Sequence, residues 1–301
     1  YLSCTSSEKI VYDCCSGSGA LTIQKWSINP NLKFVCEELD EKVIPILLFN
    51  LCIRNIEATV INKDILTGKV ICSYRTIKGS TYSSVQRLMF SEMELLKADV
   101  AISNPPFNLK VPVSENIIKA LPQKYTCNFA FVAHCLQRSE RCALILPRGV
   151  LTSKEEKECR RYFIEKGWLQ AAISLPEKMF ESTSVATCIL LFDKKKTSKD
   201  VMLINAEQMK TVEVREQRGE GEASHYNRIY KKEFNTFSDE QLVAICELLH
   251  KEQEGYSKKV SIEELLNHNY NLDIGPYLPI YMEGTLHRDF NAIIADINRV
   301  I

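Results

Sequence analysis

The chain has 301 residues, and 45% of them are hydrophobic, so it is long enough for one large domain or two smaller domains with a substantial core. It carries 38 basic and 38 acidic side chains, and this zero net charge excludes a global basic field that would draw the chain to nucleic acid. Any contact with DNA must therefore be local or be supplied by a partner.

The cysteines and the hydropathy pattern indicate the compartment. The 12 cysteines are scattered, and the closest pair, Cys14 and Cys15, is adjacent rather than at CxxC spacing. We therefore expect reduced thiols, with neither disulfides nor a metal site. The sequence shows no signal peptide and no apolar stretch of membrane-spanning length, so we expect a cytoplasmic protein without membrane contacts.

Short apolar runs alternate with helix-like segments, which favours an α/β fold with a parallel sheet covered by helices on both faces. The segment 68–97 is rich in Ser, Thr and Tyr and ends in a helical stretch at 91–97, and loops of this length are usually functional or mobile. We expect strands at 9–13, 33–38, 58–62, 99–103, 142–146, 169–175 and 187–192, with 201–205 as an additional edge strand.

The organisation of the chain follows from these elements. We expect residues 1–210 to form the main α/β domain, 211–237 to be a linker or loop, and 238–301 to be a C-terminal helical tail. Ser238 is a suitable N-cap for the first helix of this tail, three residues before Gln241. Because the first strand begins so early in the chain, we expect an N-terminal part of the parent protein to precede it.

The first strand leads into a glycine-containing loop, Asp13-Cys-Cys-Ser16-Gly17-Ser18-Gly19. Small residues let a cofactor approach the backbone, and the following helix offers free N–H groups. A dinucleotide fingerprint would need the spacing G-x-G-x-x-G, whereas this loop has two glycines and begins with an acid that repels a pyrophosphate. The loop suits instead S-adenosylmethionine, which has a cationic sulfur and an ammonium group. We expect the cofactor to be held by Asp13, Ser16, Gly17, Ser18 and Gly19.

Acidic residues follow the second and third strands. Glu38, next to Leu39, can accept both hydroxyls of a ribose, and each charge-assisted bond is worth roughly 1.5–3 kcal/mol. Asp64, next to Ile65, can accept the adenine amine of the cofactor, although a helix cap or loop acid is an equally good interpretation of this residue alone. The other acids of the second strand end are expected to be solvated charges: Glu37 and Glu41.

The fourth strand is followed by Asn104-Pro105-Pro106-Phe107. The prolines lack N–H donors and fix φ, so they turn the chain outward in a stiff loop. The Asn104 oxygen and the backbone carbonyls can together accept both hydrogens of an exocyclic amine, which makes its nitrogen more nucleophilic. Phe107 offers a flat face for stacking a base, worth roughly 1–3 kcal/mol. The alternative is an ordinary turn.

Together these motifs resemble the gamma-type DNA adenine-N6 methyltransferases, and among them the modification (M) subunit of type I restriction–modification systems. The resemblance runs from Ile10 to Tyr277. The family's loop D-P-x-C-G-S-G is matched at four positions, while Cys14 and Ser16 depart from it, and Asn104 begins the N-P-P-F/Y loop. Later segments follow in the family's order: ALILPRGVL at 143–151, ISLP at 173–176, TCIL at 187–190 and NYNLDIGPY at 269–277.

The resemblance implies the Rossmann-like fold of class I S-adenosylmethionine-dependent methyltransferases, with a mixed, mostly parallel sheet and residues 1–210 as the catalytic domain. It implies transfer of the cofactor's methyl group to N6 of an adenine flipped out of duplex DNA. The loop that holds this adenine would comprise Asn104, Pro105, Pro106 and Phe107, with Asn104 also near the cofactor. A specificity (S) subunit would read the DNA sequence, and a restriction (R) subunit would complete the nuclease.

Two other classes of function remain open. Protein glutamine methyltransferases also carry an N-P-P-Y loop, but Phe107 and the later motifs argue against them. A non-catalytic subunit that binds the cofactor or DNA is the second alternative, and the presence of Asp13, Glu38, Asp64 and Asn104 argues against loss of turnover.

Overall fold

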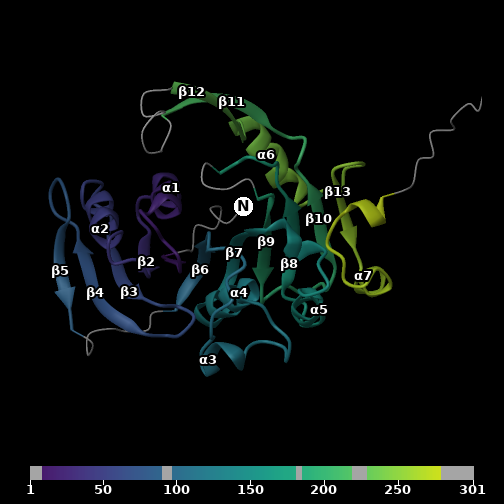
Figure 1. Ribbon diagram of the computed structural model, residues 1–301, viewed down its shortest axis with the longest axis horizontal. Coiled ribbons are helices and arrows are strands. Elements are labelled where there is room, and N and C mark those ends of the chain that lie inside the picture. Colours follow the sequence, from purple (N-terminus) through teal and green to yellow (C-terminus); the bar gives the residue numbers. More distant parts are fainter. Residues whose placement is uncertain (1–8, 90–96, 181–184, 219–228, 279–301) are drawn as a thin grey trace, which may run out of the picture.

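The computed structural model of the chain describes residues 9–89, 97–180, 185–218 and 229–278. In this part, an eleven-stranded sheet forms the centre, and two further strands form a separate hairpin (Figure 1). The strand order of the large sheet is β13-β10-β8-β9-β7-β6-β1-β2-β3-β4-β5. Its strands are β1 (Ile10–Asp13), β2 (Lys33–Glu38), β3 (Ala58–Lys63), β4 (Val70–Ile77), β5 (Ser84–Leu88), β6 (Ala98–Ser103), β7 (Ser139–Pro147), β8 (Leu169–Ser174), β9 (Thr187–Asp193), β10 (Val201–Asn205) and β13 (Ser257–Val260).

Helices cover both faces of this sheet. In Figure 1, α1, α2 and α6 lie on one side of it, and α4 and α5 lie on the other. The helices are α1 (Ala20–Ile28), α2 (Ile44–Cys52), α3 (Glu115–Ile118), α4 (Cys127–Arg138), α5 (Lys157–Glu165), α6 (Asp239–Leu248) and α7 (Ile262–Asn267), with 3-10 turns η2 (Arg148–Leu151) and η3 (Gly275–Tyr277).

The alternation of side chains along each strand explains this double cover. In β1, Val11 belongs to the hydrophobic cluster that contains Leu47 of α2, whereas its neighbour Tyr12 belongs to the cluster that contains Phe129 of α4. Successive side chains of a strand point to opposite faces, so two adjacent apolar residues meet different helices. The continuous apolar runs of the sequence are therefore those of strands buried on both faces.

The centre of the sheet is parallel. β1 pairs in parallel with β2 and β6, β2 with β3, and β6 with β7, while β4, β5, β9 and β13 pair antiparallel with their neighbours. The chain leaves β1 toward β2 and β3 and later returns to β6 on the other side, so the winding reverses between β1 and β6. In open α/β sheets, ligands bind at the carboxyl ends of the strands beside such a reversal. The predicted fold class is confirmed.

The segment 68–97 differs from the long irregular loop that we expect from its composition. β4 and β5 extend the sheet as antiparallel strands. The Thr76 hydroxyl of β4 is buried, donates to the Ile56 carbonyl at 2.7 Å and accepts from the Ala58 N–H at 2.8 Å. β4 has the sequence VICSYRTI, in which polar side chains follow the first three residues, so no apolar run of strand length marks it. The predicted helical stretch lies, apart from Lys97, outside the described residues.

The expectation of a linker or loop over 211–237 is wrong. β11 (Thr211–Arg218) and β12 (Ile229–Thr236) pair antiparallel in a hairpin. Phe234 is buried with Arg215 5.2 Å from its ring centroid, and the Asn235 N–H donates to the Lys178 carbonyl at 3.0 Å. Charged and amide side chains interrupt the apolar pattern of both strands, TVEVREQR and IYKKEFNT, so their composition resembles that of a loop.

The C-terminal segment is not the purely helical tail that we expect. The N-cap of α6 is confirmed: Ser238 and Gln241 form a capping box, with each side chain bonded to the other's backbone N–H. Beyond α6, however, β13 joins the edge of the large sheet antiparallel to β10, and Val260 of β13 is fully buried. This segment therefore completes the sheet, while residues 279–301 lie outside the described part.

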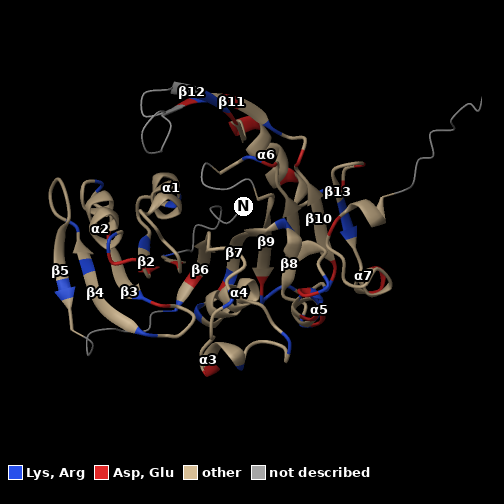
Figure 2. Ribbon diagram, in the orientation of Figure 1, with Lys and Arg blue, Asp and Glu red and all other residues tan. Residues whose placement is uncertain are grey.

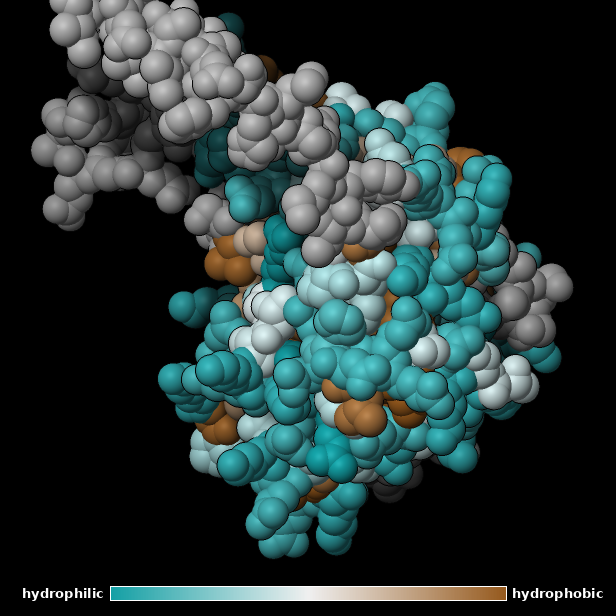
Figure 3. Space-filling view, turned by 90° about the vertical axis from the view of Figure 1, so that its right-hand side faces the viewer, coloured by the Kyte–Doolittle hydropathy of each residue, from teal (hydrophilic) through white to brown (hydrophobic). Residues whose placement is uncertain are grey.

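The surface of the molecule is mostly polar on the face toward β13 and α7. Figure 3 shows this face as largely hydrophilic, with apolar side chains in small separate patches, as on ordinary protein surfaces. No helix of the described residues combines the length and the apolar character needed to cross a membrane.

Candidate active site

A cavity of about 610 Å³ opens at the carboxyl ends of β1, β2, β3 and β6. It brings together seven of the residues that the sequence predicts for the site: Gly17, Glu38, Leu39, Asp64, Ile65, Asn104 and Pro106. These residues are up to 89 positions apart in the chain, and the parallel centre of the sheet brings the loops that carry them to one edge. The other lining residues are Cys14, Cys15, Asp40, Lys63, Leu66, Leu109, Val111 and Phe131.

Two glycines in the left-handed region shape the loop after β1, with φ of +53° at Gly17 and +92° at Gly19. A Cβ at Gly19 would lie 2.8 Å from Leu47 Cδ1, so α2 packs against this position. At Gly17, which lines the cavity, a Cβ would meet no atom of the described residues within 4 Å. The missing side chain there leaves open space beside the backbone. Ser18 and Gly19 are outside the cavity lining, and the Ser18 carbonyl accepts the Asn50 side-chain amide at 2.9 Å.

Asp13 lies beneath the loop rather than on the cavity wall. Its carboxylate accepts hydrogen bonds from the hydroxyls of Ser103 at 3.1 Å and Thr22 at 3.3 Å, and the residue is only 1% exposed. Burial raises the Asp13 pKa to about 7, despite these hydrogen bonds. Ser16 is also buried, and its hydroxyl donates to the Asp13 carbonyl at 3.0 Å. Asp13 and Ser16 therefore hold the loop through buried hydrogen bonds and do not line the cavity.

Glu38 connects the loop after β2 to the glycine loop. Its Oε2 accepts the Gly17 N–H at 2.8 Å, and its Oε1 accepts the Asp40 N–H at 2.8 Å. A carboxylate oxygen can accept two hydrogen bonds, so both oxygens keep capacity for hydroxyl groups of a ligand. The Asn62 side-chain amide donates to the carbonyls of Glu38 and Leu39 at 2.9 Å each, which fixes this turn to β3.

Asp64 and Ile65 form the part of the wall that follows β3. One carboxylate oxygen of Asp64, Oδ1, accepts the N–H groups of Leu66 at 3.0 Å and Thr67 at 3.2 Å. Asp64 Oδ1 therefore caps the turn, as the alternative interpretation of Asp64 as a loop acid predicts. The residue also lines the cavity. The capped turn holds the apolar side chains of Ile65 and Leu66 against the cavity from the β3 side.

Asn104 carries an unpaired polar atom. Its Oδ1 is buried and has no hydrogen-bond partner among the described residues. Asn104 and Pro106 line the cavity, Pro105 is buried, and Phe107 is partly buried but is not among the lining residues. The structure therefore places the amide at the cavity, while the predicted stacking on Phe107 stays a prediction.

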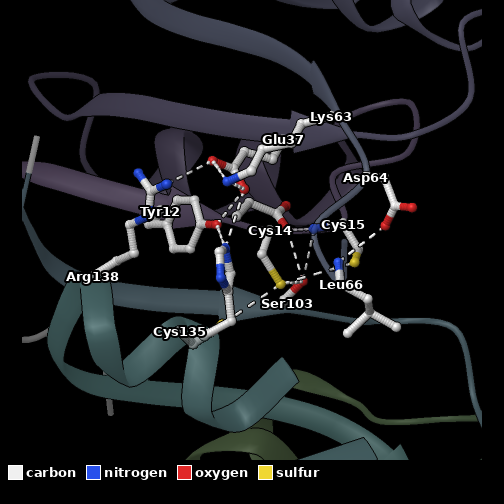
Figure 4. Close-up of polar contacts among 12 residues, drawn as sticks. Tyr12, Cys14, Cys15, Glu37, Lys63, Asp64, Leu66, Ser103, Cys135 and Arg138 are labelled. Carbon is white, nitrogen blue, oxygen red and sulfur yellow. Dashed lines mark hydrogen bonds and ion pairs between the residues drawn. The ribbon is translucent and has the colours of Figure 1, made fainter. Parts of the chain in front are cut away.

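Glu37 is not the solvated charge that we expect from its acidic surroundings. It is fully buried and lies at the centre of the network in Figure 4, where it accepts a hydrogen bond from the Tyr12 hydroxyl at 2.6 Å. Lys63, His134 and Arg138 approach its carboxylate at 3.2 to 3.3 Å. Burial alone would raise the Glu37 pKa, but the hydrogen bond and charge of His134, with the charges of Lys63 and Arg138, lower it to about 2.

Sequence reasoning missed several residues of the wall. Lys63 is the last residue of β3 and links the cavity to Glu37, and its position next to Asp64 was an available signal. Leu109 and Val111 directly follow the Asn-Pro-Pro-Phe segment, so their proximity could have been inferred. Phe131 comes from the middle of α4, and no local motif marks it.

A model of the N-6 DNA methylase family matches residues 2–283 of the chain. The chain belongs to the N-6 DNA methylase family. It is 25% identical to the type I restriction enzyme MjaVIII methylase subunit of Methanocaldococcus jannaschii, in an alignment that covers 97% of this chain and 50% of that relative. It thus spans about half the length of the curated relatives it matches.

Solved structures support the fold of this N-6 DNA methylase chain. The methyltransferase subunit of the type I restriction–modification system of Streptococcus thermophilus superposes with a TM-score of 0.68 at 20% identity, covering 89% of this chain and 54% of that one. A Listeria monocytogenes protein assigned to the class I S-adenosylmethionine-dependent methyltransferases superposes with a TM-score of 0.51 at 16% identity, covering 67% of this chain and 59% of that one. The arrangement predicted from the sequence is thus the class I methyltransferase fold.

Proposed function

We propose that this chain is the methyl-transferring part of the modification subunit of a type I restriction–modification system. It transfers the methyl group of S-adenosylmethionine to N6 of an adenine flipped out of duplex DNA. The N-6 DNA methylase family match supports this reaction, and the type I methylase subunits among the relatives support the system.

The observation that carries the proposal is the unpaired Asn104 Oδ1 at the cavity. Leaving a buried acceptor without a donor costs roughly 1–3 kcal/mol, so a ligand that donates a hydrogen bond to this oxygen gains that free energy on binding. It lies directly before two prolines, which hold it in place by fixing the backbone. An exocyclic amine such as N6 of adenine supplies the missing hydrogen.

The cavity fits S-adenosylmethionine. Its volume is within the usual range for such ligands, roughly 300–1,000 Å³. Carboxylates of Glu38, Asp40 and Asp64 lie on its wall, and they suit both the ribose hydroxyls and the positive charges of this cofactor. Ile65, Leu66 and further apolar side chains provide flat walls for the adenine ring. Gly17 leaves room for a close approach to the backbone.

The residues of this chain position the acceptor nitrogen. When bound, S-adenosylmethionine would supply an electrophilic methyl on a cationic sulfur and would leave as S-adenosylhomocysteine. Asn104 Oδ1 and the Pro105 carbonyl each accept one amine hydrogen, so the nitrogen lone pair becomes free to attack. The amine loses one proton to water after transfer, and the stiff loop contributes chiefly through near-attack geometry.

Recognition of DNA is assigned to a partner. The net charge is zero, and Figure 2 shows basic and acidic residues interspersed along the described elements rather than separated onto different faces. A neutral chain gains little from counterion release, so its own non-specific DNA affinity is low. We assign sequence reading to a specificity subunit and cleavage to a restriction subunit, within the cytoplasm.

Mapping of modified bases tests this function. Genomic DNA is sequenced for N6-methyladenine from the source strain and from the same strain without the gene. We expect one class of methylated sites to vanish with the gene and to return on complementation with the wild type. Unchanged N6-methyladenine in both strains would contradict the proposed reaction.

A further inference from the structure

A buried side chain on α4 holds the far end of the loop that begins with Asn104. Asn128 is 3% exposed, and its Oδ1 accepts the Asn108 backbone N–H at 3.0 Å. In return, its Nδ2 donates to the Asn108 side-chain oxygen at 3.1 Å. The two amides thus form a reciprocal pair between the loop and the helix.

A buried carboxylate fixes the orientation of this pair. Glu156, at the start of α5 and 5% exposed, accepts the second hydrogen of Asn128 Nδ2 at 2.8 Å. Its other oxygen accepts the Thr126 hydroxyl. Because a carboxylate only accepts, the Asn128 amide must turn its nitrogen toward Glu156 and Asn108. The amide then has one orientation in which every polar atom is satisfied.

The backbone at Asn108 needs such support. Its φ is +55°, in the left-handed region that side chains other than asparagine and aspartate rarely adopt. Cavities border the following segment on both sides, since Leu109 and Val111 line both the 610 Å³ cavity and a second one of about 450 Å³. Polar contacts with α4 therefore hold this part of the loop: the two hydrogen bonds between Asn108 and Asn128, and one from the Cys127 thiol to the Val111 carbonyl at 3.6 Å.

The position of Asn104 depends on the position of Asn108. The two residues are four positions apart, and the intervening Pro105 and Pro106 fix φ, so the segment moves as a stiff unit. Displacing one end displaces the other. A misplacement of about 1 Å in a reacting group can cost a factor of 100 in rate.

We propose that Asn128 and Glu156 are positioning residues, which hold the Asn104 amide at the place where the acceptor amine is bound. This inference rests on the proposed methyl transfer for its effect on rate, but the hold on the loop can be measured without activity. Neither residue lines the cavity beside Asn104, so both act through Asn108.

The test compares four variants of the intact protein. Asn128→Ala and Glu156→Ala break the chain of hydrogen bonds, whereas Glu156→Gln can keep both of its bonds by accepting from Asn128 and donating to Thr126. Glu155→Ala is the matched control, because it removes the same charge from the exposed neighbouring side chain. Three quantities are measured: hydrogen exchange of the amides at 107–111, the affinity for S-adenosylhomocysteine, and kcat for DNA methylation.

The expected result is a 10-fold or greater rise in exchange and a 10-fold or greater fall in kcat for both alanine variants, with cofactor affinity within about two-fold of the wild type. Glu156→Gln and Glu155→Ala should behave like the wild type. Unchanged exchange in Asn128→Ala, or equal losses in Glu156→Gln and Glu156→Ala, would overturn the inference.

Failure of the proposed function and failure of a variant to fold can each be distinguished from failure of this inference. If the wild type does not methylate DNA, the proposed function fails, and the exchange data alone then decide whether Asn128 holds the loop. If Asn128→Ala does not fold, Asn108→Ala replaces it, because this side chain is exposed and its loss cannot empty the core. It removes the side-chain oxygen that accepts the hydrogen bond from Asn128 Nδ2, and it disfavours the left-handed backbone, so unchanged exchange and kcat in it would also overturn the inference.

Discussion

The Glu38 carboxylate accepts the backbone N–H of Gly17 at 2.8 Å, so the loops that follow β1 and β2 are joined at the cavity. The oxygen that makes this bond is oriented before any ligand binds. A pre-oriented acceptor saves the entropy of ordering a free side chain when the ligand arrives.

Replacing Glu38 is therefore expected to weaken cofactor binding. Glu38→Ala removes the proposed acceptor for the ribose and the bond to the Gly17 N–H, and a lost charge-assisted bond of roughly 1.5–3 kcal/mol corresponds to about a 10- to 100-fold weaker Kd. Calorimetry with S-adenosylhomocysteine measures this change. Glu41→Ala serves as the control, because Glu41 is exposed and outside the cavity lining. Equal affinities for the two variants would rule out the role given to Glu38.

Alanine at the two glycines of the loop should have different consequences. At Gly19, a Cβ would lie 2.8 Å from Leu47 Cδ1 and the φ is +92°, so Gly19→Ala should lower the free energy of unfolding. At Gly17, the Cβ would enter open space at the cavity, so Gly17→Ala should weaken S-adenosylhomocysteine binding more than it weakens the fold. Thermal unfolding and calorimetry on both variants separate these effects. A greater loss of stability in Gly17→Ala than in Gly19→Ala would contradict the different roles given to the two glycines.

Glu37 should contribute stability that disappears in acid. Its pKa is lowered from 4.5 to about 2, so the contribution is present above pH 4.5 and is lost as the pH falls from about 4.5 toward 2. Glu37→Gln leaves the cations around it without a buried counter-charge and should cost about 3 kcal/mol at pH 7. Urea unfolding between pH 7 and pH 3 measures the difference from the wild type, which should shrink in acid. A pH-independent difference would contradict the ion-pair account.

Asp13 should show the opposite pH dependence. Its pKa is raised from 3.8 to about 7, so the folded state retains a proton that the unfolded state releases, and the stability falls as the pH rises from about 4 to 7. At about 1.4 kcal/mol for each of the roughly three pKa units, Asp13→Asn should be more stable than the wild type at pH 8 by roughly 4 kcal/mol. Urea unfolding of both proteins at pH 5 and pH 8 tests this. A less stable variant at pH 8 would show that the Asp13 carboxylate is ionised at no cost.

The strand ends of the site could be predicted from the sequence because their signals are local. Asn104-Pro105-Pro106 is a rigid turn wherever it occurs, and Glu38 stands at the end of an apolar run. Such features do not depend on what packs against them. The parallel order of the strands then brings them to one edge of the sheet.

The rest of the site depends on distant contacts that the sequence does not reveal. Glu37 looks like one more surface acid, and it is buried because Lys63, His134 and Arg138 surround it. Asn128 looks like an ordinary helix residue until α4 is packed against the loop. The hairpin of β11 and β12 escaped prediction because charged residues interrupt its apolar pattern.

We infer that the Asn104 amide holds the acceptor amine. Single-turnover methylation of an adenine-containing DNA by the intact subunit with the proposed specificity subunit tests this most directly, comparing the wild type with Asn104→Ala and measuring S-adenosylhomocysteine affinity in parallel. We expect methyl transfer to slow by roughly 100-fold or more, with cofactor affinity within a few-fold of the wild type. A transfer rate equal to that of the wild type would contradict the account.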